Sequence, residues 1–413
     1  MRALTKRRTV IAAGIAAATV AVAAAPALAA VNFLVVTPTP NLGTHHNELH
    51  AVAAVSATEM FAVGEYYNGT WDHGLILKGN GTTWAASSAP QPTFATHNVL
   101  NGVAMANASL GWAVGTYSIG KSSYNLVERY SGGSWSWVRQ SNPAGTTASE
   151  FNGVAAGSAR SVVAVGDSHG SKQAPKPISA FFNGTSWKYV AVPNPGKVGT
   201  KAHTAALSSV AVVPGTSGKR YWAVGTYSNG FNTFPFFDYW NGKKWSQHVL
   251  AKSVQSVIAA PSPVSSVVTS VAVVSANNAW AVGYYTANHT PPVPSNNRTF
   301  TVHWNGVAWS MVKSPNRVSD STPNELVSVS ARGAKAIYAV GRYFAGPYDQ
   351  TQALVWNTTV SPNAWTKITS DNNTTQHNSL EGIAMIPVKG AVSVGTYYSG
   401  TADRTLVATC KDC

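Results

Sequence analysis

The stretch Asn278-Ala279-Trp280-Ala281-Val282-Gly283-Tyr284 is a short apolar segment that ends on a glycine, and its Ala-Val-Gly core recurs along the chain. The seven copies are Ala62-Val63-Gly64, Ala113-Val114-Gly115, Ala164-Val165-Gly166, Ala223-Val224-Gly225, Ala281-Val282-Gly283, Ala339-Val340-Gly341 and the degenerate Ser393-Val394-Gly395. Successive glycines lie 51 to 59 residues apart, without helical periodicity between them. Such a period, filled with short strands, indicates propeller blades. The sequence therefore predicts an all-β fold, a seven-bladed β-propeller.

Each copy belongs to a unit that reads as four antiparallel strands. A Leu-x-x-Val strand precedes the Ala-Val-Gly strand, and a third strand ends in an aromatic stretch such as Thr299 to Trp304. Asn305-Gly306-Val307-Ala308-Trp309 then forms a hairpin, because Asn and Gly both tolerate positive φ. The repeats span about 49–88, 100–140, 151–192, 207–250, 267–313, 326–369 and 380–410.

Residue size follows the expected geometry of such blades. Small and β-branched residues fit near the axis, where strands are buried on both faces. Aromatic residues fill the wider spaces further out, so most of the 14 tryptophans are predicted core residues rather than a sugar-stacking array.

The seventh repeat lacks its fourth strand, and a matching segment occurs near the N-terminus. Residues 32–37 resemble an outer strand, with Phe33 in the place of the tryptophan. We expect this strand to complete the last blade and remove an open edge. One domain, residues 31–413, then follows a separate leader.

Residues 1–30 read as a signal peptide. Arg2, Lys6, Arg7 and Arg8 precede the apolar run from Val10 to Ala25, and Ala27-Leu28-Ala29 supplies the small residues for cleavage. The run is short for a membrane span, although a retained anchor is the alternative. Arg7-Arg8 leaves the general and twin-arginine export routes both open. We expect a secreted monomer without a membrane span after cleavage.

The two cysteines, Cys410 and Cys413, are expected to form a small-loop disulfide in an oxidising compartment. Free thiols and a redox role are the alternatives. Two thiolates are too few for a structural zinc site, and we expect neither a metal nor a cofactor.

The net charge of +14 favours anionic partners. For an exported protein these are cell-wall polymers, acidic polysaccharides or lipid head groups, whereas nucleic acid is not expected.

The repeats resemble those of secreted, actinobacterial-type propellers built from L-x-x-V, W-A-V-G and W-N-G-x-x-W, and more remotely kelch, tectonin and Asp-box propellers. The resemblance covers residues 31–413 and implies the fold. It carries little about function, since propellers include lectins, lyases, oxidases and scaffolds. An intact Asp-box, the kelch double glycines and copper or quinone signatures are absent.

Two groups of residues are candidates for a binding site. His46, His97, His203 and His377 recur just before the first strand of a blade, around the predicted channel mouth. They are either ligands or, as we favour, polar residues that tie the loops of neighbouring blades together. Lys172, Lys176, Lys197 and Lys201 form either a basic patch for anionic polymers or a solvated face. Asp72, Asp167, Asp349 and Asp403 lie near loops, but the sequence brings no two of them together.

The long, variable loops 167–177, 248–266 and 285–298 are predicted to share one face with the channel mouth, where binding residues concentrate. No catalytic set is recognisable. The sequence therefore favours a secreted, non-catalytic module that binds a cell-surface or environmental glycan through this face. A polysaccharide lyase or hydrolase at the channel mouth and a protein-interaction scaffold are the alternatives.

Overall fold

The computed structural model describes residues 32–195, 203–248, 250, 265–287, 296–318, 322–356 and 363–413. These residues form 28 β-strands and no helix, so the predicted all-β class is confirmed. No helix within the described ranges is long and apolar enough to cross a membrane.

The first strand of each sequence repeat is the innermost strand of its meander. These strands are β2 (Asn47–Ser56), β6 (His97–Asn107), β10 (Ala148–Ser158), β14 (Ala205–Val212), β18 (Ser265–Ser275), β22 (Asn324–Gly333) and β26 (Asn378–Met385).

The second strand of each repeat carries the Ala-Val-Gly signal and pairs antiparallel with the first. These strands are β3 (Glu59–Tyr67), β7 (Leu110–Ile119), β11 (Ser161–His169), β15 (Tyr221–Ser228), β19 (Asn278–Ala287), β23 (Ala336–Phe344) and β27 (Ala391–Tyr398).

The third strand of each repeat is antiparallel to the second. These strands are β4 (Asp72–Gly79), β8 (Ser122–Ser131), β12 (Lys176–Phe182), β16 (Thr233–Trp240), β20 (Asn296–Trp304), β24 (Asp349–Trp356) and β28 (Asp403–Cys410).

The outermost strands are short, and one of them comes from the other end of the chain. They are β5 (Trp84–Ser87), β9 (Ser134–Trp137), β13 (Trp187–Val190), β17 (Trp245–His248), β21 (Trp309–Met311), β25 (Trp365–Ser370) and β1 (Asn32–Val35).

The strands form one four-stranded sheet and three larger sheets of eight strands. Parallel contacts of only one or two residue pairs join the two halves of each larger sheet: Asp72 with His97, Thr233 with Ser265, and Asn32 and Phe33 with Thr369 and Ser370. The antiparallel meanders are therefore the main units of pairing.

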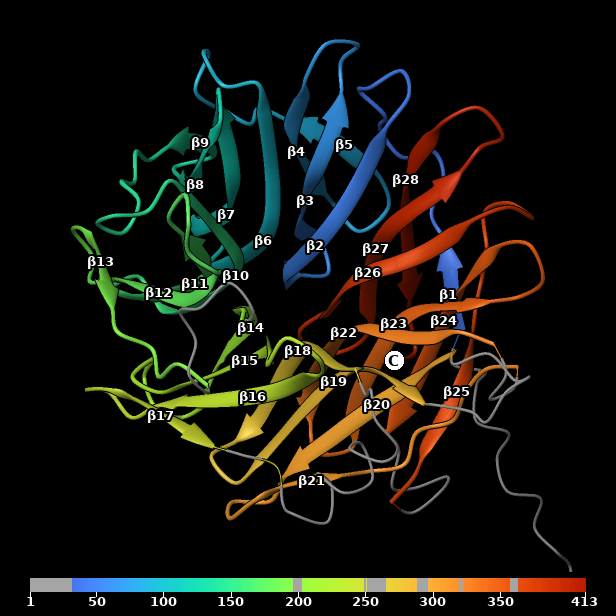
Figure 1. Cartoon of the computed structure of the whole chain (residues 1–413). Helices are drawn as coiled ribbons and strands as arrows, with labels where there is room; N and C mark the ends of the chain where they lie inside the picture. The colour runs from blue at the N-terminus through green and yellow to red at the C-terminus, as the bar shows by residue number, and fades with distance from the viewer. Residues whose placement is uncertain are drawn as a thin grey trace, which may run out of the picture. The chain divides into compact units, whose positions relative to one another are not determined.

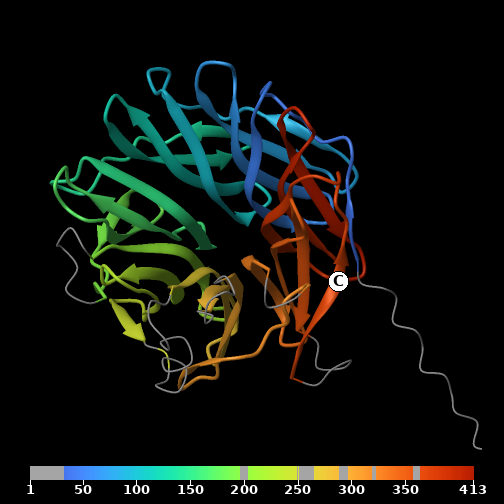
Figure 2. The ribbon, with the colours of Figure 1, turned by 45° about the vertical axis from the view of Figure 1, so that its right-hand side comes forward.

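The meanders of residues 32–413 follow one another around a common centre, which is a propeller-like arrangement (Figure 1). A cavity of about 410 Å³ lies there, and all of the innermost strands β2, β6, β10, β14, β18, β22 and β26 contribute to its lining. The turned view shows the same succession, with the blue N-terminal strands beside the red C-terminal ones (Figure 2). Residues far apart in sequence thus share one central channel.

Strand β1 pairs antiparallel with β28, through Leu34 opposite Thr409 and Val35 opposite Ala408. Phe33 is fully buried in the same hydrophobic cluster as Leu406 and Ala408. The N-terminal segment therefore supplies the outer strand that the seventh repeat lacks.

The glycine of the Ala-Val-Gly signal is required by a β-bulge on the innermost strand. In β2 the register shifts between Leu49 and Ala51, opposite Gly64. A Cβ atom at Gly64 would collide with the backbone carbonyl of Glu48. A Cβ atom at Gly166 would collide with the backbone carbonyl of Glu150 in the same way. Glycine recurs at this position because the backbone of the inner strand leaves no room for a Cβ atom there.

The tryptophans that open the outer strands pack into the core, among them the buried Trp84, Trp135 and Trp309. A disulfide joins Cys410, the last residue of β28, to Cys413. Arg332 on β22 also reaches this end of the chain and donates to the carbonyl of Cys413 at 2.7 Å.

Candidate functional site

One position of the repeat carries charge on only three of the meanders. Two residues that face each other define this position at the channel mouth. One lies on the inner strand, just before the buried Leu, Phe or Val that pairs with the Ala-Val-Gly glycine. The other follows that glycine on the second strand. Facing pairs with charge are Glu48 with Glu65, Glu150 with Asp167, and Glu325 with Arg342. The other pairs are uncharged: Val99 with Thr116, Ala206 with Thr226, Val267 with Tyr284, and Ser379 with Thr396. The charge therefore breaks the symmetry of the fold.

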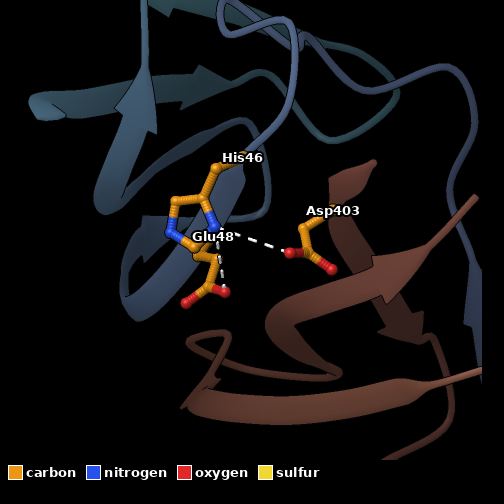
Figure 3. Close-up of side chains that lie close together, drawn as sticks. All are labelled: His46, Glu48 and Asp403. Carbon is orange, nitrogen blue, oxygen red and sulfur yellow. Dashed lines mark ion pairs between the residues drawn. The ribbon is translucent and has the colours of Figure 1, made fainter. Parts of the chain in front are cut away.

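His46 lies at the centre of a cluster of carboxylates (Figure 3). Its Nδ1 is 3.5 Å from Glu48 Oε1 and 3.5 Å from Asp403 Oδ2, and its Nε2 is 3.5 Å from Glu65 Oε1. His50 adds a contact of 3.6 Å between its Nε2 and the second oxygen of Glu48. Strands β2, β3 and β28 thus place two imidazoles among three carboxylates.

These neighbours shift the protonation equilibria. The hydrogen bond to Glu65 outweighs burial and, with the charge of Glu48, raises the pKa of His46 to about 9. Burial disfavours the charged form of Glu48, but the hydrogen bond to His50 and the charge of His46 prevail and lower the pKa of Glu48. Glu48 is therefore ionised and His46 protonated at neutral pH when no other cation is bound.

A polar cavity of about 350 Å³ opens beside this cluster. Its lining includes the carboxyl side chains of Glu48, Asp349, Glu381 and Asp403, the guanidinium of Arg342, the imidazoles of His50 and His377, and the tyrosines Tyr397 and Tyr398. The guanidinium of Arg342 lies 2.8 Å from Glu325 Oε2 and 3.7 Å from Glu381 Oε1. The cavity thus offers hydrogen-bond donors and acceptors around one opening, at the junction of the first, sixth and seventh repeats.

Three of the four predicted histidines pair with the aspartate that begins the third strand of the preceding repeat. His97 Nδ1 lies 2.6 Å from Asp72 Oδ2, and His377 Nδ1 lies 3.5 Å from Asp349 Oδ2. His46 meets Asp403 in the same relation. His377 lines the cavity, and His46 contacts Asp403, which also lines it, whereas His97 contacts Asp72 and Trp71. His203 is half-buried and precedes β14. The histidines thus serve several junctions rather than one described ligand ring.

The asparagine after such a histidine holds the loop backbone. Asn378 is buried, its Oδ1 accepts from the N–H of Asn373, and its Nδ2 donates to the carbonyls of Thr374 and Gln376. Asn47 makes the same kind of contacts with Gly43. The amide is therefore the main fastening of the loop.

Replacing Asn378 with alanine should accordingly cost about 1–3 kcal/mol, because buried backbone groups lose their partners. His377→Ala removes a half-exposed pair and should cost no more than about 1 kcal/mol. Urea unfolding of both variants measures the difference. Equal losses would show that the imidazole shares the structural role.

The predicted basic patch is described only in part. Lys172 is exposed in the turn before β12, and Lys176 is the first residue of β12. Lys197 and Lys201 lie outside the described residues, as do most of the longest loops, at 251–264 and 288–295. The described part of the site is therefore the channel mouth.

Exposed aromatic side chains also occur at this end of the molecule. Trp71 and Phe231, 42% and 88% exposed, stand on the loops between β3 and β4 and between β15 and β16. Asn68 Oδ1 accepts from the N–H of Trp71, and Asn229 Oδ1 accepts from the N–H of Phe231. Each loop is thereby held in a tight turn that presents an aromatic ring to solvent.

Comparison with known proteins gives no family and no curated relative: no family model matches the chain, and no curated protein does. Solved structures do match. The polysaccharide lyase Uly1 is 10% identical, with a TM-score of 0.52, over 91% of this chain and 92% of that one. A protein of unknown function from Dyadobacter fermentans is 10% identical, with a TM-score of 0.50, over 94% of this chain and 100% of that one. The likeness is one of fold. The β-propeller domain of the trilobed protease from Pyrococcus furiosus, 8% identical, also matches, with a TM-score of 0.45 over 88% of this chain and 95% of that domain.

Proposed function

We propose that this chain is a secreted, seven-bladed β-propeller that binds a glycan at the mouth of its channel without cleaving it. The observation that carries the proposal is the polar cavity, whose carboxylates, guanidinium, imidazoles and tyrosines converge on about 350 Å³. Ligand pockets begin at about this volume and use a few convergent polar groups for orientation. Sugar hydroxyls both donate to carboxylates and accept from guanidinium and phenol groups, so this lining suits a polyhydroxylated ligand.

The blade count is supported by strand pairing. Six repeats contribute four strands each, and β1 adds a fourth strand beside β28 in the seventh. The eight-stranded sheets divide at contacts of one or two residue pairs, so each is best described as two neighbouring blades. Secretion rests on the leader, residues 1–30, which lie outside the described residues.

The exposed rings of Trp71 and Phe231 add apolar surface on the same end of the fold. An aromatic ring can pack against the apolar face of a sugar. One similar structure belongs to a polysaccharide lyase, which agrees with carbohydrate as the ligand class.

The charge of the cavity favours a neutral or cationic glycan there. The lining has four carboxyl side chains, Glu48, Asp349, Glu381 and Asp403, against one guanidinium and two imidazoles, although the whole chain is basic. An anionic polymer would meet repulsion at this mouth. The expectation of an anionic partner therefore rests on the lysine loops around residues 172–201.

The lowered pKa of Glu48 argues against Glu48 as the acid of a glycoside hydrolase. Glycoside hydrolysis needs one carboxylic acid with a raised pKa beside one carboxylate. Glu48 has a lowered pKa and is ionised. It therefore acts as a hydrogen-bond acceptor rather than as an acid.

A polysaccharide-active enzyme is the second candidate, favoured by Glu150 and Asp167. Burial and the neighbouring Asp167 raise the pKa of Glu150, and burial raises the pKa of Asp167 to about 6. Two carboxyls that face each other in register, with one able to hold a proton near neutral pH, could supply an acid and a base.

Glycan arrays with the mature protein should give binding to a neutral or amino-sugar glycan without release of reducing ends. Arg342→Ala should weaken binding roughly tenfold or more, because a charge-assisted hydrogen bond is lost. Arg160→Ala, at an exposed arginine of the turn between β10 and β11, should bind as the parent does.

Release of shorter sugar products, or formation of a double bond by β-elimination, from any glycan that binds would overturn the binding-only proposal. If Glu150→Gln then abolished turnover while Arg342→Ala spared it, the second candidate would replace the first.

A further inference from the structure

The spacing around His46 differs from that of an ordinary ion-pair cluster. Nδ1 is equidistant, at 3.5 Å, from Glu48 Oε1 and Asp403 Oδ2, and one ligand atom from each residue lies within 4.8 Å of the others. Strong hydrogen bonds between charged groups are shorter, about 2.7–2.9 Å. The three side chains therefore approach one another without close contact, and Figure 3 shows them converging from β2, its preceding loop and β28.

The two nitrogen–oxygen separations of 3.5 Å match edges of a tetrahedral coordination sphere. Metal–ligand bonds of about 2.0–2.2 Å to imidazole and carboxylate place neighbouring ligand atoms about 3.3–3.5 Å apart. One nitrogen and two carboxylate oxygens are also a donor set used by zinc. Calcium instead prefers six to eight oxygen ligands, which the imidazole does not provide.

Neighbouring groups would orient the ligands. With Nδ1 towards the metal, the Nε2–H of His46 points to Glu65 Oε1, 3.5 Å away. Metal-bound histidines commonly donate their second N–H to a carboxylate in this way. The amide of Asn47 donates to the backbone carbonyl of Asp403 at 3.2 Å, which fixes the start of β28 beside β2.

We propose that His46, Glu48 and Asp403 bind one divalent transition-metal ion of the zinc class, with the fourth coordination position open to the cavity. Glu48 and Asp403 line that cavity, so the open position is accessible to water or to a ligand oxygen. The ion would also link the first inner strand to the last described strand. Cys410 and Cys413, which are too few for a structural zinc site, are not ligands in this proposal. The proposal also does not depend on a glycan ligand.

A second set, Glu48, His50 and Glu65, shares a carboxylate with the first. The proposed set includes Asp403 and has its open position at the cavity. His50→Ala distinguishes the two, because it removes a ligand only from the second set.

The test is zinc titration, by calorimetry, of untagged mature protein after removal of metal with a chelator. We expect one ion per chain. Asp403→Asn and His46→Gln should each weaken binding more than Glu65→Gln does, and the latter should cost roughly 10–100-fold, as for an outer-shell partner. His97→Ala should leave the affinity unchanged, and His50→Ala should weaken it no more than Glu65→Gln does, because His50 contacts only the second oxygen of Glu48.

Cobalt provides a second readout, since tetrahedral coordination gives intense visible absorption that His46→Gln should abolish. Thermal melting without metal verifies that each variant is folded. Lack of stoichiometric zinc binding by the parent protein would overturn the proposal, and so would binding that survives Asp403→Asn but is lost in His50→Ala.

Discussion

Replacing Phe33 with alanine is expected to lower the free energy of unfolding by about 3–5 kcal/mol, the usual cost of deleting a buried aromatic side chain. Phe33 is fully buried, although it belongs to a strand of only four residues. It packs in one cluster with Val340, Val355 and Leu406, so its ring bridges the sixth and seventh repeats. Removing it leaves a cavity between these two repeats.

The adjacent residue supplies a matched control. Leu34 lies on the same strand and pairs with β28 but is 51% exposed, so Leu34→Ala should cost less than about 1 kcal/mol. Deleting residues 32–36 should be worse than either substitution, because β28 then has an unpaired edge that promotes aggregation. Urea unfolding and light scattering measure both effects. Comparable stability of the Phe33 and Leu34 variants would contradict the closure by β1.

Replacing Glu128 with glutamine is expected to stabilise the protein at pH 8. Glu128 is completely buried on β8, and neither carboxylate oxygen has a hydrogen-bond partner among the described residues. Burial raises its pKa to about 9. Each unit of pKa shift corresponds to about 1.4 kcal/mol, so a shift of several units is a large destabilisation at alkaline pH.

The direction follows from proton linkage. The folded protein keeps the Glu128 proton up to about pH 9, whereas the unfolded chain loses it near its ordinary pKa of 4.5. The stability of the parent protein therefore falls as pH rises between these values. Glu128→Gln cannot ionise, so its advantage should grow from pH 5 to pH 8 and fade at pH 4.

Asp238 provides an independent replicate in another repeat. It is also fully buried, and burial raises its pKa to about 7, so Asp238→Asn should show the same trend over a narrower range, from about pH 4 to pH 7. Melting temperatures across pH check both variants. An advantage of Glu128→Gln that does not change with pH would mean that ionisation of this carboxyl is not what destabilises the parent.

The repeat itself suggests a further substitution. Glu128 faces Ala113, and at the same position the first and sixth repeats have Leu77 and Leu354. The fold thus accommodates leucine at this position in two other repeats, and Glu128→Leu is the substitution that the repeat suggests.

The strands could be predicted because the same strand pattern recurs in every repeat. The weak match Ser393-Val394-Gly395 is therefore supported by the six Ala-Val-Gly copies. The N-terminal strand was found by the same logic, since the seventh repeat lacked a partner. The buried carboxylates Glu128 and Asp238 could not be predicted to be buried from local sequence, because the faces of β8 and β16 that carry them pack against the preceding repeat.

The site was predicted only in part. The histidines were noticed because they recur, but the charged pairs at the mouth become visible only when strand register is known. Glu48 and Glu65 face each other through an antiparallel pairing that a β-bulge shifts by one residue. His46 meets Asp403 because ring closure brings the two ends of the domain together. A comparison of equivalent repeat positions for unlike charge would have signalled Glu48, Glu150 and Arg342.

The pairing of β1 with β28 also determines the order in which the molecule can assemble. Each of the other meanders pairs strands that follow one another closely, so it can form while the rest of the chain is still being made. Leu34 of β1, in contrast, pairs with Thr409 of β28, which is made almost last. A chain released before β28 is made lacks the antiparallel partner of β1, although β25 can still pair with Asn32 and Phe33. The antiparallel pairing of β1 thus forms only after the seventh repeat has been made.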